Sequence, residues 1–329
     1  MIVTVIEHDR GQLKDISFEL LTLAHKLSQT KNEPVAAVVL ADNSQPFVEP
    51  LAPYAHKILV IEDPLLGNFN NYLYFSSLSK LLTELRPAVT LFGHTGQGTD
   101  LAPYLASFLG WPIITDIFDS EFTNGQLLAR RTMFGCKINA KVLANSLPVI
   151  LTLRQGSFDK INSGTFNLPT IKAEVEKFSV TLEPSLLTRS KFLEYAEAPT
   201  TGIDITKAEV IVAVGRGIKE EKNLKMVEEF AQEIGGTLAC TRPIIDAGWL
   251  PKDRQVGSSG KTVKPKLYIA LGISGAFQHI SGMKGSELII AVNKDPEAPI
   301  FSVAHYGVVA DLFKVLPALA NKIKELKSR

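Results

Sequence analysis

Residues 267–279 have the sequence LYIALGISGAFQH, in which an apolar run meets a loop of small residues. The apolar run ends at Leu271 and is short enough for a buried strand, which is expected at 266–271. The loop that follows contains Gly272, Ser274 and Gly275, and a helix is expected after it. A strand that passes through a glycine-rich loop into a helix is typical of an open parallel sheet.

Similar strand–loop–helix units surround this stretch in the second half of the chain. Strands are expected at 210–214, 237–240 and 287–292, and helices at 220–234 and 310–326. Each of these strands is followed by small or polar residues, at 215–217, 241–242, 272–275 and 293–294. Because the carboxyl ends of parallel strands meet at one edge of a sheet, we expect these loops to converge on one ligand site.

The first half of the chain alternates strand and helix patterns in the same way, until residue 111. The strands are expected at 2–6, 34–40, 56–61 and 88–92, and the helices at 15–29, 70–85 and 98–109. Beyond Trp111, Asn124 and Gly125 form a strong hairpin-turn pattern, and strands are expected at 138–144, 149–153 and 173–180. We predict an α/β protein with two domains. Residues 1–196 form a Rossmann-like domain with added antiparallel strands, and residues 197–329 form a parallel-sheet domain.

The composition excludes several classes of function. Lys plus Arg is 35 and Asp plus Glu is 34, so the net charge of +1 provides no general attraction to nucleic acid or to an anionic membrane. No apolar run reaches the ~18 residues of a membrane span. Cys136 and Cys240 are far apart, and no histidine or cysteine cluster has metal-ligand spacing, so no metal site is expected. We expect a prokaryotic cytoplasmic protein, or one of the mitochondrial matrix if a presequence is missing.

The glycine loops leave two interpretations open. Glycines at 215, 217, 272 and 275 allow backbone amides to approach a phosphate closely, as in many nucleotide sites. They are equally compatible with tight turns between strands and helices.

Three stretches in these loops match known enzyme motifs only in part. Residues 260–262 resemble the end of a Walker A loop, but Gln255 stands where that loop needs a glycine. Residues 272–276 resemble a nucleophile elbow, but Ala276 replaces its last glycine. Residues 215–217 begin a dinucleotide fingerprint, but Gly235 stands where an acidic residue would bind ribose. These departures argue against an NTPase, an esterase and a standard NAD site.

A longer set of motifs resembles one family, the alpha subunits of electron transfer flavoproteins. The dense similarity covers about residues 210–316, and the first half is similar in size and in the order of its elements. The motifs that carry the resemblance are 267–279, Gly282 with Met283, 290–295, 299–301, 310–313, 241–243 and 255–257, with 100–103 in the first half.

The resemblance implies that FAD binds in the second domain. The residues at the family's FAD-contacting positions are Arg216, Thr241, Arg242, Val256, Gly257, Ser258, Ser259, Ser274, Gly275, Ala276, Phe277, Gln278, His279, Asn293, Asp311 and Leu312. By the same resemblance, Arg242 would lie against the isoalloxazine ring, His279 near its pyrimidine edge, and the Ser259 hydroxyl at N5. A cation or hydrogen-bond donor there would stabilise negative charge on the reduced ring.

Two positions depart from the family pattern. Ser259 replaces a frequent threonine but keeps the hydroxyl group. His305 replaces an expected aspartate, so the contact made at that position is in question.

The family resemblance also implies partners and a role. The first domain would pack against a beta subunit in a heterodimer. The protein would be an electron carrier and no enzyme: it would accept electrons from acyl-CoA or related dehydrogenases, as in fatty acid β-oxidation, and pass them to a quinone oxidoreductase. The alternatives are a subunit of an electron-bifurcating, NADH-linked complex, a nucleotide-binding enzyme with a fold like that of deoxyhypusine synthase, and a nucleotide-sensing module without redox function.

Overall fold

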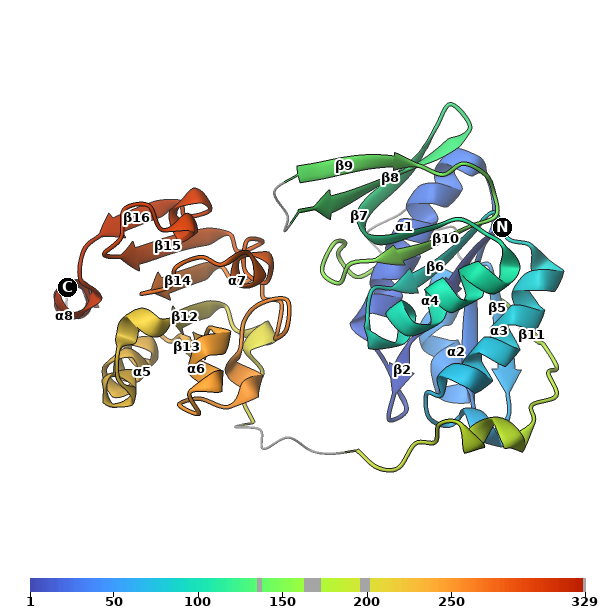
Figure 1. Ribbon diagram of the computed structural model, residues 1–329, viewed down its shortest axis with the longest axis horizontal. Helices are drawn as coiled ribbons and strands as arrows, with labels where there is room; N and C mark the ends of the chain where they lie inside the picture. The colour runs from blue at the N-terminus through green and yellow to red at the C-terminus, as the bar shows by residue number, and fades with distance from the viewer. Residues whose placement is uncertain (135–137, 163–172, 196–201, 328–329) are drawn as a thin grey trace. The chain divides into compact units, whose positions relative to one another are not determined.

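The computed structural model describes residues 1–134, 138–162, 173–195 and 202–327. It consists of two compact units, Met1–Glu194 and Tyr195–Arg329 (Figure 1). The domain boundary expected between residues 196 and 197 falls in a segment outside the described residues, as does Cys136, so that boundary stays a prediction.

The N-terminal unit is built on a nine-stranded sheet with the order β11-β5-β4-β1-β6-β10-β7-β8-β9. Its strands are β1 (Ile2–Val5), β4 (Val35–Ala41), β5 (Lys57–Glu62), β6 (Val89–Gly93), β7 (Ile113–Thr123), β8 (Gln126–Met133), β9 (Ile138–Leu143), β10 (Val149–Leu153) and β11 (Glu174–Lys177). A small separate hairpin, β2 (His8–Asp9) and β3 (Gln12–Leu13), follows β1. Every residue of β1, β4, β6 and β10 is buried, because helices cover both faces of the centre of the sheet.

Helices form a layer on each face of this sheet. The core on one face includes side chains of α1 (Asp15–Lys31) and α2 (Gln45–Leu51). The core on the other face includes side chains of α3 (Asn71–Leu85) and α4 (Gly96–Leu109). The residues before these two helices, Asn70 and Thr95, accept hydrogen bonds from backbone N–H groups of the first turn, which explains where the helices begin.

The predicted hairpin is confirmed, but two of the later strands are not antiparallel. Asn124 and Gly125 have φ angles of 51° and 78° and join β7 to β8, and β9 adds to β8 in antiparallel orientation. In contrast, β10 lies between β6 and β7, parallel to both, and β11 pairs in parallel with β5 at the other edge. The physical reason for β10 is that four of its five residues are apolar and all five are buried, which is possible on both faces only inside the sheet.

The C-terminal unit is a five-stranded, fully parallel sheet with the order β13-β12-β14-β15-β16. The strands are β12 (Val210–Val214), β13 (Thr237–Cys240), β14 (Leu267–Leu271), β15 (Leu288–Asn293) and β16 (Tyr306–Val309). The helices are α5 (Leu224–Glu233), α6 (Arg242–Asp246), α7 (Phe277–Ser281) and α8 (Leu312–Lys327). The predicted strands and helices are present, and β16 is an addition that the sequence analysis missed.

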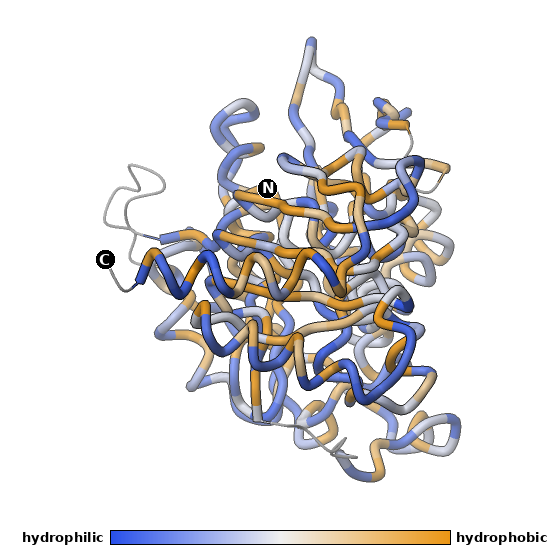
Figure 2. The backbone as a smooth tube through the Cα atoms, turned by 90° about the vertical axis from the view of Figure 1, so that its left-hand side faces the viewer, coloured by the Kyte–Doolittle hydropathy of each residue, from blue (hydrophilic) through white to orange (hydrophobic). Residues whose placement is uncertain are grey.

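The two faces of this second sheet are covered differently. Side chains of α5, α6 and α8 form the core on one face. Hydrophobic and hydrophilic residues alternate along α8, as expected for a helix with one side packed on the sheet (Figure 2). The core on the other face is completed by loop residues such as Val256, Val263 and Met283. Across the described ranges, no helix combines the length and the apolar character needed to cross a membrane.

Candidate functional site

A cavity of about 590 Å³ lies at the carboxyl ends of the parallel strands of the C-terminal unit. Its walls come from the loops after β12, β13, β14 and β15, so the expected convergence of the four loops is confirmed. The chain goes from β12 to β13 on one side and then to β14 on the other, and open sheets bind ligands at such a change of direction. The volume is typical of a small-molecule or cofactor site.

Most of the predicted site residues line this cavity. They are Arg216, Thr241, Arg242, Val256, Gly257, Ser259, Ser274, Ala276, Gln278, His279 and Asn293. The cavity walls do not include Ser258, Gly275, Phe277, Asp311 or Leu312. Contact of any of these residues with a cofactor stays a prediction.

Three of the predicted residues outside the cavity wall have structural roles beside it. The Asp311 carboxylate accepts a hydrogen bond from the Phe313 N–H at 3.0 Å and so caps α8. Leu312 is buried in the core under that helix. Gly275 has a φ of 86°, and a Cβ there would lie 2.1 Å from the backbone nitrogen of Ile300. Gly275 therefore fixes the loop after β14 against Ile300, while Asp311 and Leu312 fix the start of α8.

Several residues of the wall were not among the predicted cofactor contacts, although some belong to the predicted loops. They are Gly215, Gly217, Pro243, Asp246, Gln255, Gly272, Ile273, Lys294, Asp295, Ala298 and Pro299. Lys294 belongs to the loop at 293–294 that the sequence predicted at the site, and Asp295 directly follows it. Ala298 and Pro299 come from the start of a 3-10 turn, which no strand-end rule predicts.

The glycines after β12 and β14 are required by contact between two loops. A Cβ on Gly215 would lie 2.6 Å from the carbonyl oxygen of Gly272, and one on Gly217 would lie 2.6 Å from the Gly272 Cα. The Gly217 N–H donates to the Gly272 carbonyl at 3.0 Å. The tight-turn interpretation is therefore correct for these glycines. The same two loops also form part of the cavity wall. The tight-turn interpretation therefore does not exclude a ligand at these glycines.

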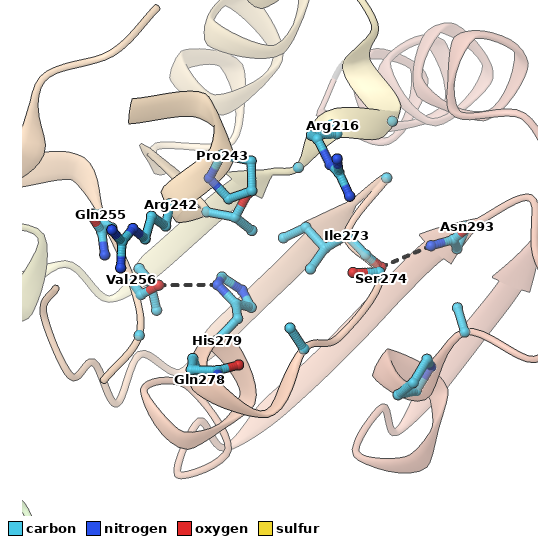
Figure 3. A pocket seen from close by; sticks show the side chains of 18 of the residues that line it. Arg216, Arg242, Pro243, Gln255, Val256, Ile273, Ser274, Gln278, His279 and Asn293 are labelled. Atoms are coloured by element: carbon cyan, nitrogen blue, oxygen red, sulfur yellow. Dashed lines mark hydrogen bonds between the residues drawn. The ribbon is translucent and has the colours of Figure 1, made fainter. Parts of the chain in front are cut away.

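Two arginines provide positive charge at the cavity (Figure 3). Arg242 is 68% exposed, and its Nε lies 3.5 Å from the Asp246 carboxylate, an exposed pair of the kind that is weak. Arg216 forms no ion pair with any residue in the described part of the chain. Neither guanidinium is strongly engaged, so both can bind an anionic group such as a phosphate.

His279 is buried and held by two hydrogen bonds. Its Nδ1 lies 3.1 Å from the Val256 carbonyl oxygen (Figure 3), and its Nε2 lies 2.9 Å from the Tyr268 hydroxyl. Because a carbonyl oxygen only accepts, Nδ1 carries the proton and Tyr268 donates to Nε2. Burial lowers the pKa of His279 to about 4, although the bond to Val256 opposes the shift. The ring is therefore neutral near pH 7, and the cationic side chains of the wall are arginine and lysine.

The polar side chains of the wall also orient the loops. The Asn293 amide donates to the Ile273 carbonyl at 2.8 Å and accepts from the Asp295 N–H at 3.0 Å. His305, the departure noted in the sequence, lies outside the cavity wall and accepts from the Ile289 N–H through Nδ1 at 2.9 Å. An aspartate could accept the same hydrogen bond, so the substitution preserves the local backbone contact.

The donor set suits an elongated anionic ligand with a polar ring. Two guanidinium groups can neutralise phosphate, and the hydroxyls of Thr241, Ser259 and Ser274 offer both donors and acceptors. The apolar side chains of Val256 and Ile273 supply surface for a ring. The residues present therefore fit a phosphate-bearing aromatic cofactor.

Two protein-family models match the chain. Residues 2–183 match the electron transfer flavoprotein domain, and residues 204–284 match the electron transfer flavoprotein FAD-binding domain. The second match contains the loops of β12, β13 and β14 that line the cavity.

Curated proteins are similar over almost the whole chain. The identity is 38% over 324 residues to the electron transfer flavoprotein subunit alpha of Thermoanaerobacterium thermosaccharolyticum, covering 98% of this chain and 97% of that protein. It is 38% over 329 residues to subunit LctC of the lactate dehydrogenase (NAD(+),ferredoxin) of Acetobacterium woodii, covering 98% and 77%. It is 37% over 318 residues to the electron transfer flavoprotein subunit alpha of Methylophilus methylotrophus, covering 95% and 96%.

Proposed function

This chain belongs to the electron transfer flavoprotein alpha-subunit family and contains its FAD-binding domain, and we propose that it is an electron carrier that turns over no substrate of its own. The observation that carries the proposal is the cavity at the β12–β14 edge, which lies among the loops of the FAD-binding domain. We infer that the residues expected from the sequence contact FAD, and that those lining the cavity make the main contacts.

FAD, when bound, supplies the one- and two-electron redox chemistry. The residues of this chain would bind it, orient it and set the electrostatic potential around it. Arg242 and Arg216 would stabilise negative charge, because a cation near a partly desolvated group acts more strongly than in water. Ser259 would offer its hydroxyl to N5. His279 would contribute a neutral ring near the pyrimidine edge, with its Nε2 already bonded to Tyr268.

We further propose that the N-terminal unit binds a beta subunit through the β8–β9 ribbon. Apolar side chains are exposed along it: Met133 by 40%, Phe134 by 72%, Ile138 by 53% and Leu143 by 50%. β9 is also the edge strand of the sheet, so one row of its backbone groups is unpaired. Met133 and Ile138 form a cross-strand pair on one face of the ribbon, and Leu143 lies on the other face. Exposed apolar side chains beside an open strand edge are typical of a surface that a partner covers.

The electron donors and acceptors are proposed from the family. Acyl-CoA or related dehydrogenases, as in fatty acid β-oxidation, would reduce the carrier, and a quinone oxidoreductase would oxidise it, in the cytoplasm of a prokaryote. A second candidate is a subunit of an electron-bifurcating, NADH-linked complex. It is favoured by the similarity to LctC, whose enzyme is named for both NAD(+) and ferredoxin.

A visible absorption spectrum tests the proposal. The chain would be tagged and purified with the protein that accompanies it. Flavin absorption bands, FAD release on denaturation and a smaller protein in equal amount are the expected results. One FAD per pair would support the simple carrier, and two would support the bifurcating complex. A colourless protein that takes up no added FAD would refute the proposed function.

A further inference from the structure

The side chain of Gln255 is buried behind the cavity wall and directed at one hydroxyl group. It is only 4% exposed, although part of it reaches the cavity. Its Nε2 donates a hydrogen bond to the Oγ of Ser259 at 2.8 Å. Ser259 itself is exposed at the cavity, so the amide contacts the hydroxyl from the protein side.

The backbone around Gln255 fixes this orientation. The carbonyl of Gln255 accepts from the Lys261 N–H at 2.7 Å, and the Gly257 N–H donates to the Lys261 carbonyl at 3.1 Å. The loop therefore closes on itself around the side chain. Gly260 completes the closure, because a Cβ there would lie 2.4 Å from the Gln255 carbonyl oxygen and 2.9 Å from its Cγ.

The contact decides what the serine hydroxyl can do. A hydroxyl group has one proton to donate and two lone pairs to accept with. The Gln255 amide occupies one lone pair, and so favours the rotamer in which the hydroxyl proton is directed to another group. We propose that Gln255 is a positioning residue that makes Ser259 a hydrogen-bond donor to an acceptor atom of the bound cofactor. This inference rests on the proposed function, in which that atom is N5 of FAD.

A direct consequence concerns the oxidised cofactor. A ring nitrogen without a proton accepts a hydrogen bond, so a committed donor at Ser259 favours binding of oxidised FAD. Without the amide, the hydroxyl can rotate and spend part of its time as an acceptor. Substitution of Gln255 should therefore weaken FAD binding through Ser259. It should have little effect on FAD binding in a variant that already lacks the Ser259 hydroxyl.

A double-mutant cycle tests this coupling. Gln255→Met keeps an elongated side chain but removes the donor, and Ser259→Ala removes the hydroxyl. The Kd of oxidised FAD and the visible spectrum would be measured on the deflavinated complex with its co-purifying partner. Each single variant should weaken FAD binding roughly tenfold and shift the flavin bands in the same direction. The double variant should bind FAD no more weakly than Ser259→Ala alone.

Two controls separate positioning from a general effect. Ser259→Thr keeps the hydroxyl and should retain both the affinity and the spectrum. Gln232→Glu changes an exposed glutamine of α5 and should leave both unchanged. If Gln255→Met does not fold, Gln255→Glu keeps the size of the side chain. Its carboxylate would draw the serine proton away from the cavity, so Ser259→Ala should again add little.

The outcomes distinguish this inference from the function on which it rests. Additive losses in a protein that binds FAD, or spectral shifts of opposite sign, would overturn the role of Gln255 alone. Failure of the unsubstituted complex to bind FAD would overturn the proposed function as well.

Discussion

Glu7, at the end of β1, is a buried carboxylate with one oxygen that has no hydrogen-bond partner among the described residues. Thr95 donates to the other oxygen at 2.7 Å, and Lys14 lies 4.0 Å away. Burial raises the pKa of Glu7, because the charged carboxylate is less stable in the folded protein than in water. Its contribution to stability is therefore complete below the ordinary glutamate pKa and is lost as the pH rises through the raised value.

Glu7→Gln should stabilise the N-terminal unit by about 1 kcal/mol at pH 7, because it removes a buried charge and keeps an oxygen that can accept from Thr95. The gain should disappear near pH 4, where Glu7 is itself protonated. Urea unfolding at both pH values measures the difference. An equal gain at both values would contradict the explanation.

The hydrogen bonds of His279 predict its protonation state. Nitrogen-15 NMR at neutral pH should show a proton on Nδ1 and none on Nε2, and this state should persist down to about pH 5 because the pKa is about 4. Since the unfolded chain takes up the proton at higher pH, the stability of the C-terminal unit should fall between the ordinary histidine pKa and pH 4. Tyr268→Phe removes the donor to Nε2 and should destabilise the unit by about 1 kcal/mol. A proton on Nε2 at neutral pH would refute the assignment.

Arg242 is expected to tune the potential of the cofactor. Arg242→Ala removes a cation from the cavity and should lower the reduction potential of the flavin. The negative charge of the reduced flavin should be less stable by about 1–2 kcal/mol. Spectroelectrochemical titration of the flavin measures it. Lys225→Ala removes an equal charge from the exposed side of α5 and should have no such effect. An unchanged potential in Arg242→Ala would show that another group stabilises the charge.

At the scale of the elements, the loop after β14 is held against the turn at Pro299–Ser302 by Gly275. A Cβ at this glycine would overlap the Ile300 backbone, and its φ of 86° disfavours any side chain. Gly275→Ala should destabilise the C-terminal unit by about 3 kcal/mol or more and abolish FAD binding. Gly248→Ala is the matched control, since Gly248 has a similar φ of 75° but open space around it. It should cost only the backbone strain, about 1 kcal/mol. Similar losses in thermal unfolding of both variants would contradict the steric explanation.

The β8–β9 ribbon carries the prediction about the partner. Ile138→Glu and Leu143→Glu place charges on the exposed ribbon and should prevent co-purification of the beta subunit without unfolding the chain. Val175→Glu on β11 makes the same change at the opposite edge of the sheet, where the side chain is 49% exposed. Retention of the partner by the ribbon variants, or its loss in the control, would place the interface elsewhere.

Each of the two compact units has its own hydrophobic cores. The two faces of the first sheet are packed by residues of the N-terminal unit, and those of the second sheet by residues of the C-terminal unit. We expect two thermal transitions, of which FAD shifts one. At a concentration of about 100 times its Kd, FAD should stabilise the C-terminal unit by about 2.7 kcal/mol. Calorimetry with and without FAD measures this, and an equal shift of both transitions would show that the units unfold together.

Local patterns were sufficient for most elements and for the position of the site. Apolar runs and helical spacing predicted β12–β15 and the helices beside them, because burial of one face dictates those periods. The loops at the strand ends predicted the cavity. The family followed from contiguous motifs, and the family models and curated relatives confirm it.

Short-range periodicity and contiguous motifs were enough to predict the α/β class, the family and the loops that line the cavity. The central place of β10, the Nδ1 proton of His279 and the contact of Gln255 with Ser259 could be read only from the folded chain. The reason is that each depends on which groups meet in space. An apolar strand does not encode its neighbours, and a histidine or glutamine does not encode which atom will satisfy its buried nitrogen.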